Sequence, residues 1–263
     1  MNILRQILRD KGREIDVRKE AMPIRAIQQQ AERAPNPPDF LKALRRVPIA
    51  LIAEVKRRSP SAGIIRTPFD PARIAAAYHA GGANAVSVLL DGPYFGGGEA
   101  DFSAVHHAVP LPMLYKEFVI DEWQVYHARA IGASAVLLIA AALPAKRLAV
   151  LHRLIEAVGL VPLVEVHDRR ELAVALDVGT RVVGVNNRNL KTFVTNLETT
   201  HRLAGMLPPG AMLVSESGIS SPEDVLQLKA AGARAVLVGE HLLRQRNLTR
   251  ATRNLMGPAW AAS

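Results

Sequence analysis

The sequence predicts an α/β protein of the (β/α)8 type, the TIM barrel, with an N-terminal helical extension. Eight short apolar runs alternate with amphipathic helical patterns, and charged or polar residues follow most of these runs. Several helical patterns end at a glycine just before the next run. A length of 263 residues suits one barrel of this kind. A doubly wound sheet ranks second, because it would need fewer strands and a point where the strand order reverses.

The start of the chain is expected to be helical and to pack on the barrel. Residues 1–34 have the apolar spacing of a helix, and the segment Ala34-Pro-Asn-Pro-Pro38 interrupts it. Residues 40–44 begin a short helix that leads to the first strand. A segment of about 45 residues rarely folds alone. We therefore expect an extension over residues 1–45 and a catalytic barrel over residues 46–263, which together form a single domain.

The strands and helices of the barrel follow in order. Each predicted strand is a short apolar run, as in strands that are buried on both faces. The predicted strands are Ala50–Val55, Ala85–Leu90, Met113–Phe118, Ala135–Ile139, Val161–Val166, Val182–Asn186, Met212–Ser215 and Ala235–Val238. The predicted helices are Pro71–Ala80, Asp101–His107, Trp123–Ile131, Ala145–Val158, Arg169–Asp177, Leu197–Ala204, Pro222–Ala230 and Leu248–Leu255.

The composition excludes several classes of protein. The absence of cysteine removes disulfides, thiolate nucleophiles and zinc–thiolate sites. No run approaches the roughly 18 uninterrupted apolar residues of a membrane span. Residues 1–20 are charged throughout, unlike a secretion signal. We therefore expect a cytoplasmic protein without a membrane partner.

The positive charge favours an anionic small molecule over a nucleic acid. The net charge is +9, and residues 1–46 hold 11 Lys and Arg against 6 Asp and Glu. The sequence has neither a block of five Lys or Arg residues nor a basic sheet with interleaved aromatic residues, which are typical of nucleic-acid binding. A basic cleft that attracts a small anion explains the charge equally well.

The chemistry is expected where the strands end, because active sites of this barrel lie at that face. Glu54 and Lys56 are two residues apart, so a strand points both to one face. One such pair alone is often only a salt bridge at the rim. The same parity points Lys116 inward, with Glu54 as its expected partner, and turns Glu117 to the other side. Further polar side chains recur at the ends of later strands, namely Glu165, Asn186, Asn187, Arg188, Asn189 and Glu216.

Two glycine turns predict a phosphate site after the last two strands. Ser217-Gly218 follows the seventh strand and Gly239-Glu240 follows the eighth. Glycine lets backbone N–H groups approach an anion, and many barrels bind phosphate at these loops. Either turn alone would indicate only the start of a helix.

Other candidate residues carry less information. Phe95, Phe118 and Leu137 are either core residues or contacts to an aromatic substrate. His106 and His107 are adjacent and cannot share a helix face, so we expect no metal site.

Seven motifs resemble the indole-3-glycerol-phosphate synthase family of tryptophan biosynthesis, and they are spread in order from about residue 49 to residue 244. They read IAEVKRRSPSAG, LYKEFVID, AVLLIAAAL, LVEVHD, GVNNRNLKTF, VSESGI and VLVGEHLLR. The first 45 residues also resemble the extension of that family. The resemblance implies a lyase that decarboxylates and cyclises 1-(2-carboxyphenylamino)-1-deoxyribulose 5-phosphate, releasing carbon dioxide and water and using no cofactor. It leaves room for association with other enzymes of the tryptophan pathway.

The resemblance also implies roles for individual residues. Lys116 resembles the general acid of ring closure, and Glu165 resembles the acid/base partner of the later dehydration. Lys56 is similar to the lysine near the anionic groups of the substrate, and the division of work between the two lysines stays open. Glu54 would orient the lysines. The remaining implied contacts are Ser59, Asn186, Arg188 and Glu216 for the carboxylate and hydroxyls, Ser217, Gly218, Gly239 and Glu240 for the phosphate, and Phe95, Phe118, Leu137 and Leu190 around the aromatic ring.

Two other readings compete with the synthase. A related phosphate-binding barrel, such as a phosphoribosyl isomerase, usually needs an acid/base pair other than these lysines and Glu165. A basic barrel that binds without turnover would not need Lys116 and Glu165. Four departures from the usual family pattern leave open a divergent copy serving another pathway, and they are Ala62, Leu90, Tyr115 and His241.

Overall fold

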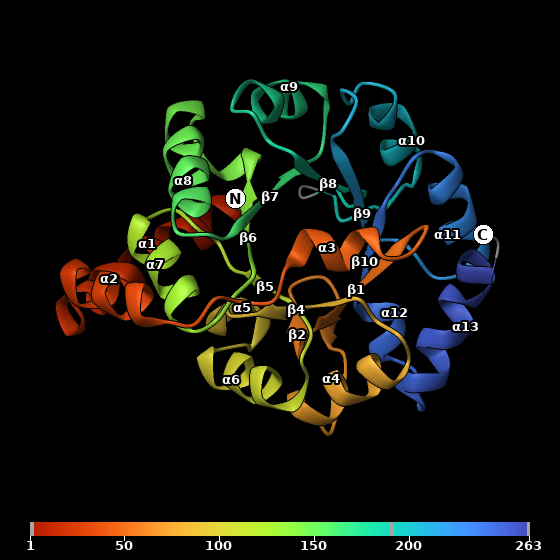
Figure 1. The fold of residues 1–263 in the computed structure, drawn as a ribbon, viewed down its shortest axis with the longest axis horizontal. Helices are drawn as coiled ribbons and strands as arrows, with labels where there is room; N and C mark the ends of the chain where they lie inside the picture. The colour runs from red at the N-terminus through yellow and green to blue at the C-terminus, as the bar shows by residue number, and fades with distance from the viewer. Residues whose placement is uncertain (1–2, 190–191, 262–263) are drawn as a thin grey trace.

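The computed structural model describes residues 3–189 and 192–261 and contains a closed barrel of eight parallel strands (Figure 1). Each strand pairs with the next one along the chain, and the last pairs with the first through Ala50 and Ala235. This confirms the predicted fold. The barrel strands are β1 (Ala50–Val55), β4 (Ala85–Leu89), β5 (Met113–Lys116), β6 (Ala135–Ile139), β7 (Val161–Val166), β8 (Val182–Asn186), β9 (Met212–Glu216) and β10 (Ala235–Val238).

Helices surround the barrel, and three of them precede its first strand. A short antiparallel hairpin, β2 (Arg58–Ser59) and β3 (Gly63–Ile64), lies in the loop after β1. None of the described helices is long and apolar enough to cross a membrane. The helices are α1 (Ile3–Ala21), α2 (Ile24–Arg33), α3 (Phe40–Arg45), α4 (Pro71–Ala80), α5 (Gly92–Phe95), α6 (Glu99–Ala108), α7 (Glu122–Ala130), the 3-10 turn η1 (Ala140–Ala142), α8 (Ala145–Ala157), α9 (Arg169–Asp177), α10 (Glu198–Ala204), α11 (Pro222–Ala230), α12 (Glu240–Leu243) and α13 (Leu248–Ala261).

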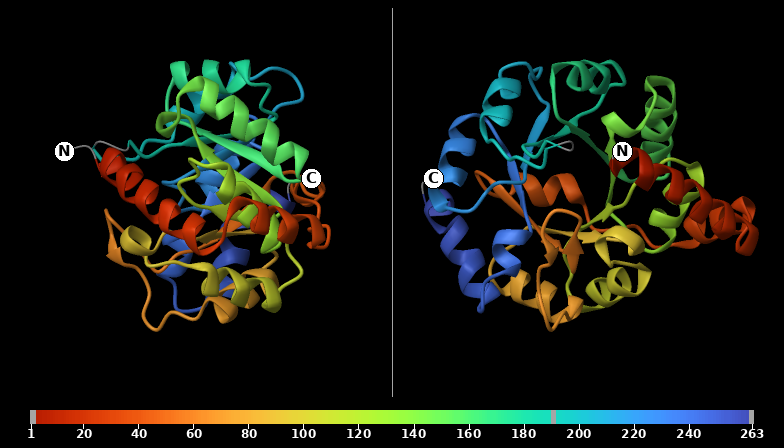
Figure 2. Two further views of the ribbon diagram at one scale, coloured as in Figure 1. Left: turned by 90° about the vertical axis from the view of Figure 1, so that its left-hand side faces the viewer. Right: turned by 180° about the vertical axis from the view of Figure 1, so that it is seen from behind.

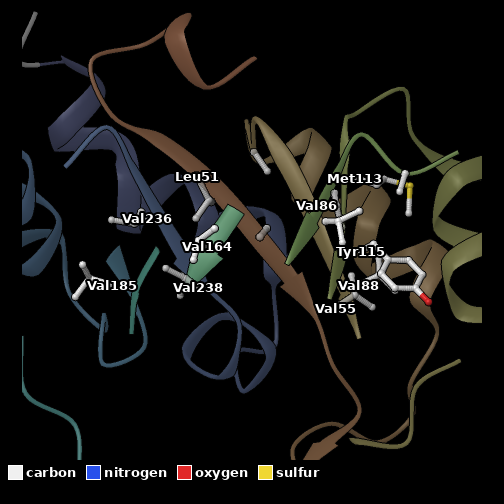
Figure 3. Close-up of a cluster of buried hydrophobic side chains, with 14 of the residues drawn as sticks. Leu51, Val55, Val86, Val88, Met113, Tyr115, Val164, Val185, Val236 and Val238 are labelled. Atoms are coloured by element: carbon white, nitrogen blue, oxygen red, sulfur yellow. The ribbon is translucent and has the colours of Figure 1, made fainter. Parts of the chain in front are cut away.

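Side chains of each strand alternate between two buried layers. Outward-facing residues such as Leu51, Val86 and Tyr115 pack under the helices (Figure 3). Inward-facing residues fill the barrel itself, and they include Ala50, Ile52, Ala85, Leu114, Ala135, Leu137, Leu163, Val182, Val214, Ala235 and Leu237. Because the strand period is two, the next inward position at several strand ends carries a polar residue instead. This alternation places the charged groups together above an apolar core.

Different parts of the first 45 residues cover the two ends of the barrel (Figures 1 and 2). At the N-terminal ends of the strands, α3 buries Phe40 and Leu44 in the inner core. Asp39 caps this helix by accepting a hydrogen bond from the backbone N–H of Lys42 at 2.8 Å. At the other end, the first turns of α1 reach over the mouth of the barrel. The chain before β1 therefore closes the barrel at the N-terminal ends of the strands and partly covers it at their C-terminal ends.

Several predicted boundaries were wrong for identifiable reasons. The helix expected over residues 1–34 is two helices, because Pro23 cannot continue α1 and instead precedes α2 with an extended backbone (ψ 152°). The strand expected to reach Phe118 ends at Lys116, since the carboxylate of Glu117 accepts the Phe118 N–H at 2.7 Å. Conversely, β9 includes Glu216, and α13 continues to Ala261.

Candidate active site

A cavity opens at the C-terminal ends of the strands, beneath α1. It is lined by inward-facing strand residues, by the loops that follow them, and by Ile3, Leu4 and Ile7 of α1. Every described residue to which the resemblance gave a role lines this cavity, whereas Asn187 and Asn189 do not, and Leu190 lies outside the described residues. The structure therefore brings these residues together in one cavity, and their assignment to the site and their roles stay predictions.

Lys116 lies at the centre of three carboxylates. Its Nζ donates a hydrogen bond to Oε2 of Glu216 at 2.6 Å and lies 3.8 Å from Oε2 of Glu165 and 3.9 Å from Oε2 of Glu54. The three carboxylates are at most 4% exposed. Burial alone would lower the pKa of Lys116, but attraction to Glu216, Glu165 and Glu54 outweighs it and raises the pKa. The side chain is therefore an ammonium ion that can donate a proton.

The predicted ion-pair partner of Lys116 was only partly correct. Parity predicted Glu54, but Glu216 of β9 is nearer, and Glu54 instead pairs with Lys56 at 2.5 Å. Burial would raise the pKa of Glu54, yet Lys56 and Lys116 lower it below its ordinary value. Parity was correct for Glu117, whose carboxylate pairs with Lys11 of α1 and not with Lys116.

Two glycines make room for these carboxylates. A Cβ at Gly184 of β8 would lie 2.2 Å from Oε1 of Glu216, and one at Gly239 would lie 2.6 Å from Oε1 of Glu54. Both approaches are closer than any side chain tolerates. The bare backbone at these positions lets Glu216 and Glu54 lie flat inside the barrel and reach the lysines.

Glu165 is held from one side. Its Oε1 accepts a hydrogen bond from Nδ2 of Asn186 at 3.2 Å and lies 3.3 Å from Nε2 of His167. Its Oε2 faces Lys116. Burial would raise the pKa of Glu165, but His167, Lys116 and Asn186 lower it, so the group rests as a carboxylate.

The loops after β9 and β10 form the rim at one side of the cavity. Ser217 and Gly218 both have left-handed backbones, with φ of 66° and 81°. Nη2 of Arg188 lies 3.5 Å from Oε2 of Glu240, and its Nη1 bonds Ser61 near Ser59. A left-handed turn of this kind exposes backbone N–H groups to an anion.

The opposite wall of the cavity is apolar. The rings of Phe95 and Phe118 lie 6.0 Å apart between centroids, and Leu137 lines the floor. An apolar wall facing a charged floor suits a flat aromatic molecule that also carries anionic groups. Within the described residues, no three His, Asp or Glu side chains form a group that could hold a metal ion.

The sequence interpretation missed two contributors. His167 follows Glu165 by two residues, so the parity argument used for Glu54 and Lys56 would have found it. The contribution of Ile3, Leu4 and Ile7 to the cavity has no local signal, since an apolar helical stripe indicates burial and not what it covers.

Comparison with known proteins gives a consistent result. A family model described as indole-3-glycerol phosphate synthase matches residues 4–255. A protein of that name from Parafrankia sp. (strain EAN1pec) is 50% identical over 240 residues, which are 91% of this chain and 90% of the relative. Another from Rhodospirillum rubrum is 47% identical over 262 residues, covering 97% of this chain and 99% of the relative.

Solved structures with low sequence identity share the barrel. A thiamine phosphate pyrophosphorylase from Pyrococcus furiosus superposes with a TM-score of 0.61 at 16% identity, covering 81% of this chain and 96% of the other. An N-acetylmannosamine-6-phosphate 2-epimerase from Clostridium perfringens gives a TM-score of 0.60 at 17% identity, covering 76% and 90%. These two likenesses bear on the fold alone.

Proposed function

The chain belongs to the indole-3-glycerol phosphate synthase family of carboxy-lyases, and from this premise we propose how its own residues carry out the reaction. The substrate would be 1-(2-carboxyphenylamino)-1-deoxyribulose 5-phosphate. The main support is the position of Lys116, an ammonium ion within 4 Å of three buried carboxylates at the mouth of the barrel.

Binding would use the two sides of the cavity. The aromatic ring packs against the wall formed by Phe95, Phe118 and Leu137, and the phosphate meets Lys56, the hydroxyl of Ser217 and the backbone of Ser217, Gly218, Gly239 and Glu240. Lys56 and Arg188 supply positive charge for the two anionic groups. Ser59 and Asn186 offer hydrogen bonds to the carboxylate and hydroxyls.

Ring closure comes first. Lys116 donates a proton to the ribulose carbonyl oxygen while the ring carbon that bears the carboxylate attacks the carbonyl carbon. A carbon–carbon bond and a hydroxyl form together. Carbon dioxide then leaves, and the electrons of the broken bond return to the aromatic ring.

Dehydration completes the reaction. The new hydroxyl takes a second proton from Lys116, reprotonated from solvent, and leaves as water. Glu165 takes the proton that the neighbouring CH2 group loses as the ring double bond forms. Two protons are delivered and one is recovered, so each turnover takes up one proton from solvent to replace the carboxylate.

The arrangement of the chain supports one catalytic unit. We propose that residues 1–45 form a helical extension of a barrel over residues 46–263, and that the protein acts in the cytoplasm on a small molecule without nucleic acid. The test is the rise of indole fluorescence when the purified protein meets the substrate. Absence of that signal would contradict the proposed reaction, and its persistence in Glu165→Gln would contradict the role of Glu165.

A further inference from the structure

His167 lies in the turn between β7 and α9, between two carboxylates. Its Nε2 is 3.3 Å from Oε1 of Glu165, and its Nδ1 is 2.9 Å from Oε2 of Glu171. The backbone N–H of His167 donates to the same oxygen of Glu171 at 2.8 Å. The ring is hydrogen-bonded to Glu171 on one side and lies against Glu165 on the other, and its side chain is only 13% exposed.

This geometry favours a charged ring. Nδ1 is within hydrogen-bond distance of Glu171, and Nε2 lies beside the Glu165 carboxylate without being aligned for a hydrogen bond, so each nitrogen faces a negative charge that stabilises a ring protonated on both sides. Burial opposes the charge, but Glu165 and Glu171 outweigh it and raise the pKa of His167 to about 10. His167 is therefore an imidazolium throughout the neutral range.

The imidazolium also distinguishes the two oxygens of Glu165. Oε1 is taken by Asn186 and His167, whereas Oε2 faces Lys116 and the cavity. Only Oε2 is available to move a proton to or from a bound molecule.

We propose that His167 is a positioning residue for Glu165, which holds Oε1 so that Oε2 takes and returns the proton in the reaction. The proposal rests on the acid/base role of Glu165 proposed above. The positive charge of His167 keeps the resting Glu165 carboxylate ionised and holds it in one orientation. Glu171 in turn keeps the imidazolium in place.

The charged groups around Glu165 set the sign of the expected effect. Lys116 faces it from β5, Glu54 from β1 and Glu216 from β9, while His167 and Glu171 lie behind it. Removing the imidazolium takes away a cation and leaves the other carboxylates. The pKa of Glu165 must then rise, and the ionised base is lost at a higher pH than before.

The test is the pH dependence of kcat/KM in His167→Gln and His167→Lys. The glutamine keeps a neutral N–H donor, so the acidic limb should move up by about 1 pH unit, the lower range for loss of a neighbouring charge. The lysine keeps the charge at the spacing that Lys56 already has from Glu54, so its acidic limb should stay near that of the native protein. A lower kcat with an unmoved limb in His167→Gln would mean a merely structural role and would overturn the proposal.

His152→Gln is the control, because His152 of α8 is a histidine buried even more fully than His167 that does not line the cavity. Its pH profile should match that of the native protein. If His167→Gln fails to fold, nitrogen NMR of the native protein decides the question. Two protonated ring nitrogens at pH 8 support the proposal, and a neutral ring overturns it. Retained turnover in Glu165→Gln would instead contradict the acid/base role of Glu165, on which the proposal for His167 rests.

Discussion

Lys11 Nζ lies 3.0 Å from Oε2 of Glu117, and this buried ion pair joins the first helix to the strand that carries Lys116. The same ammonium lies 3.2 Å from Oδ1 of Asp91. Asp91 in turn caps α5, whose last residue is Phe95, by accepting the N–H groups of Tyr94 and Phe95. One cation thus connects α1 to both sides of the aromatic wall.

Lys11→Met should destabilise the protein and loosen the aromatic wall. It leaves Glu117 and Asp91 buried without their cation, a change that costs about 3 to 5 kcal/mol. KM should rise with it, because Phe95 and Phe118 lose their common anchor. Lys19→Met is the control, since Lys19 pairs with Asp121 at 2.9 Å from the same helix but is 38% exposed, and it should cost under about 1 kcal/mol. Equal losses of unfolding free energy in urea would contradict this difference.

Lys116→Met and Lys56→Met should separate the work of the two lysines. Loss of the general acid should lower kcat at least about 100-fold, while a phosphorylated product analogue still binds. Loss of Lys56 should mainly raise KM, because the proposed role of that lysine is attraction of anionic groups. Steady-state indole fluorescence and ligand titration measure both quantities. Near-normal turnover in Lys116→Met would refute the mechanism.

Gly184→Ala should reduce both stability and turnover. The added Cβ would lie 2.2 Å from Oε1 of Glu216 and 2.7 Å from Cδ2 of Leu163, so both side chains must shift and the hydrogen bond from Lys116 to Glu216 is disturbed. Overpacking of this kind costs about 1 to 3 kcal/mol. Gly205→Ala is the control, because its φ is −68° and nothing lies within 4 Å of the new Cβ. A Gly184→Ala enzyme with unchanged kcat would show that the contact between Glu216 and Lys116 is dispensable.

Ser217→Gly should stabilise the protein and weaken substrate binding. Ser217 has a φ of 66°, a left-handed conformation that costs a side-chain-bearing residue about 1 kcal/mol and glycine very little. The glycine loses the hydroxyl proposed to meet the phosphate, so KM should increase. Thermal melting and steady-state kinetics give the two readouts, and a rise in stability without any change in KM would remove Ser217 from the phosphate site.

The two buried histidines should affect stability with opposite pH dependence. The pKa of His167 is raised, so its contribution is complete below about pH 6.5 and is lost as pH rises through about 10. Burial lowers the pKa of His152, so the folded state is disfavoured as pH falls below about 6.5. The stability difference between native protein and His167→Gln should therefore shrink toward pH 10, whereas the corresponding difference for His152→Gln should change only in acid. Urea titrations measure these differences at each pH. The prediction would be contradicted if the two differences in unfolding free energy changed with pH in the same direction.

The barrel and the place of the site were predictable because both depend on local signals. Short apolar runs between glycine turns define the strands, and strand parity put Glu54, Lys56 and Lys116 on the inner face. Parity does not say how far a side chain from another strand will reach. That is why Glu216, whose space depends on Gly184 of the neighbouring strand, was not expected as the nearest partner of Lys116.

Other features depend on contacts between distant segments. Parity predicted that Glu117 faces away from Lys116, but not that its partner would be Lys11, which lies 106 residues earlier in the chain. The break of the first helical region, by contrast, was readable from Pro23, because proline lacks the N–H that an interior helical residue donates.

The plug formed by α3 has a consequence for the movement of molecules through the enzyme. Phe40 and Leu44 fill the N-terminal end of the barrel, and the cavity opens at the mouth beneath α1. We therefore expect the substrate to enter, and carbon dioxide, water and the phosphorylated product to leave, through this same opening. The product must depart before the next substrate can enter, so we expect it to inhibit the enzyme competitively, with release a candidate for the slowest step of the cycle.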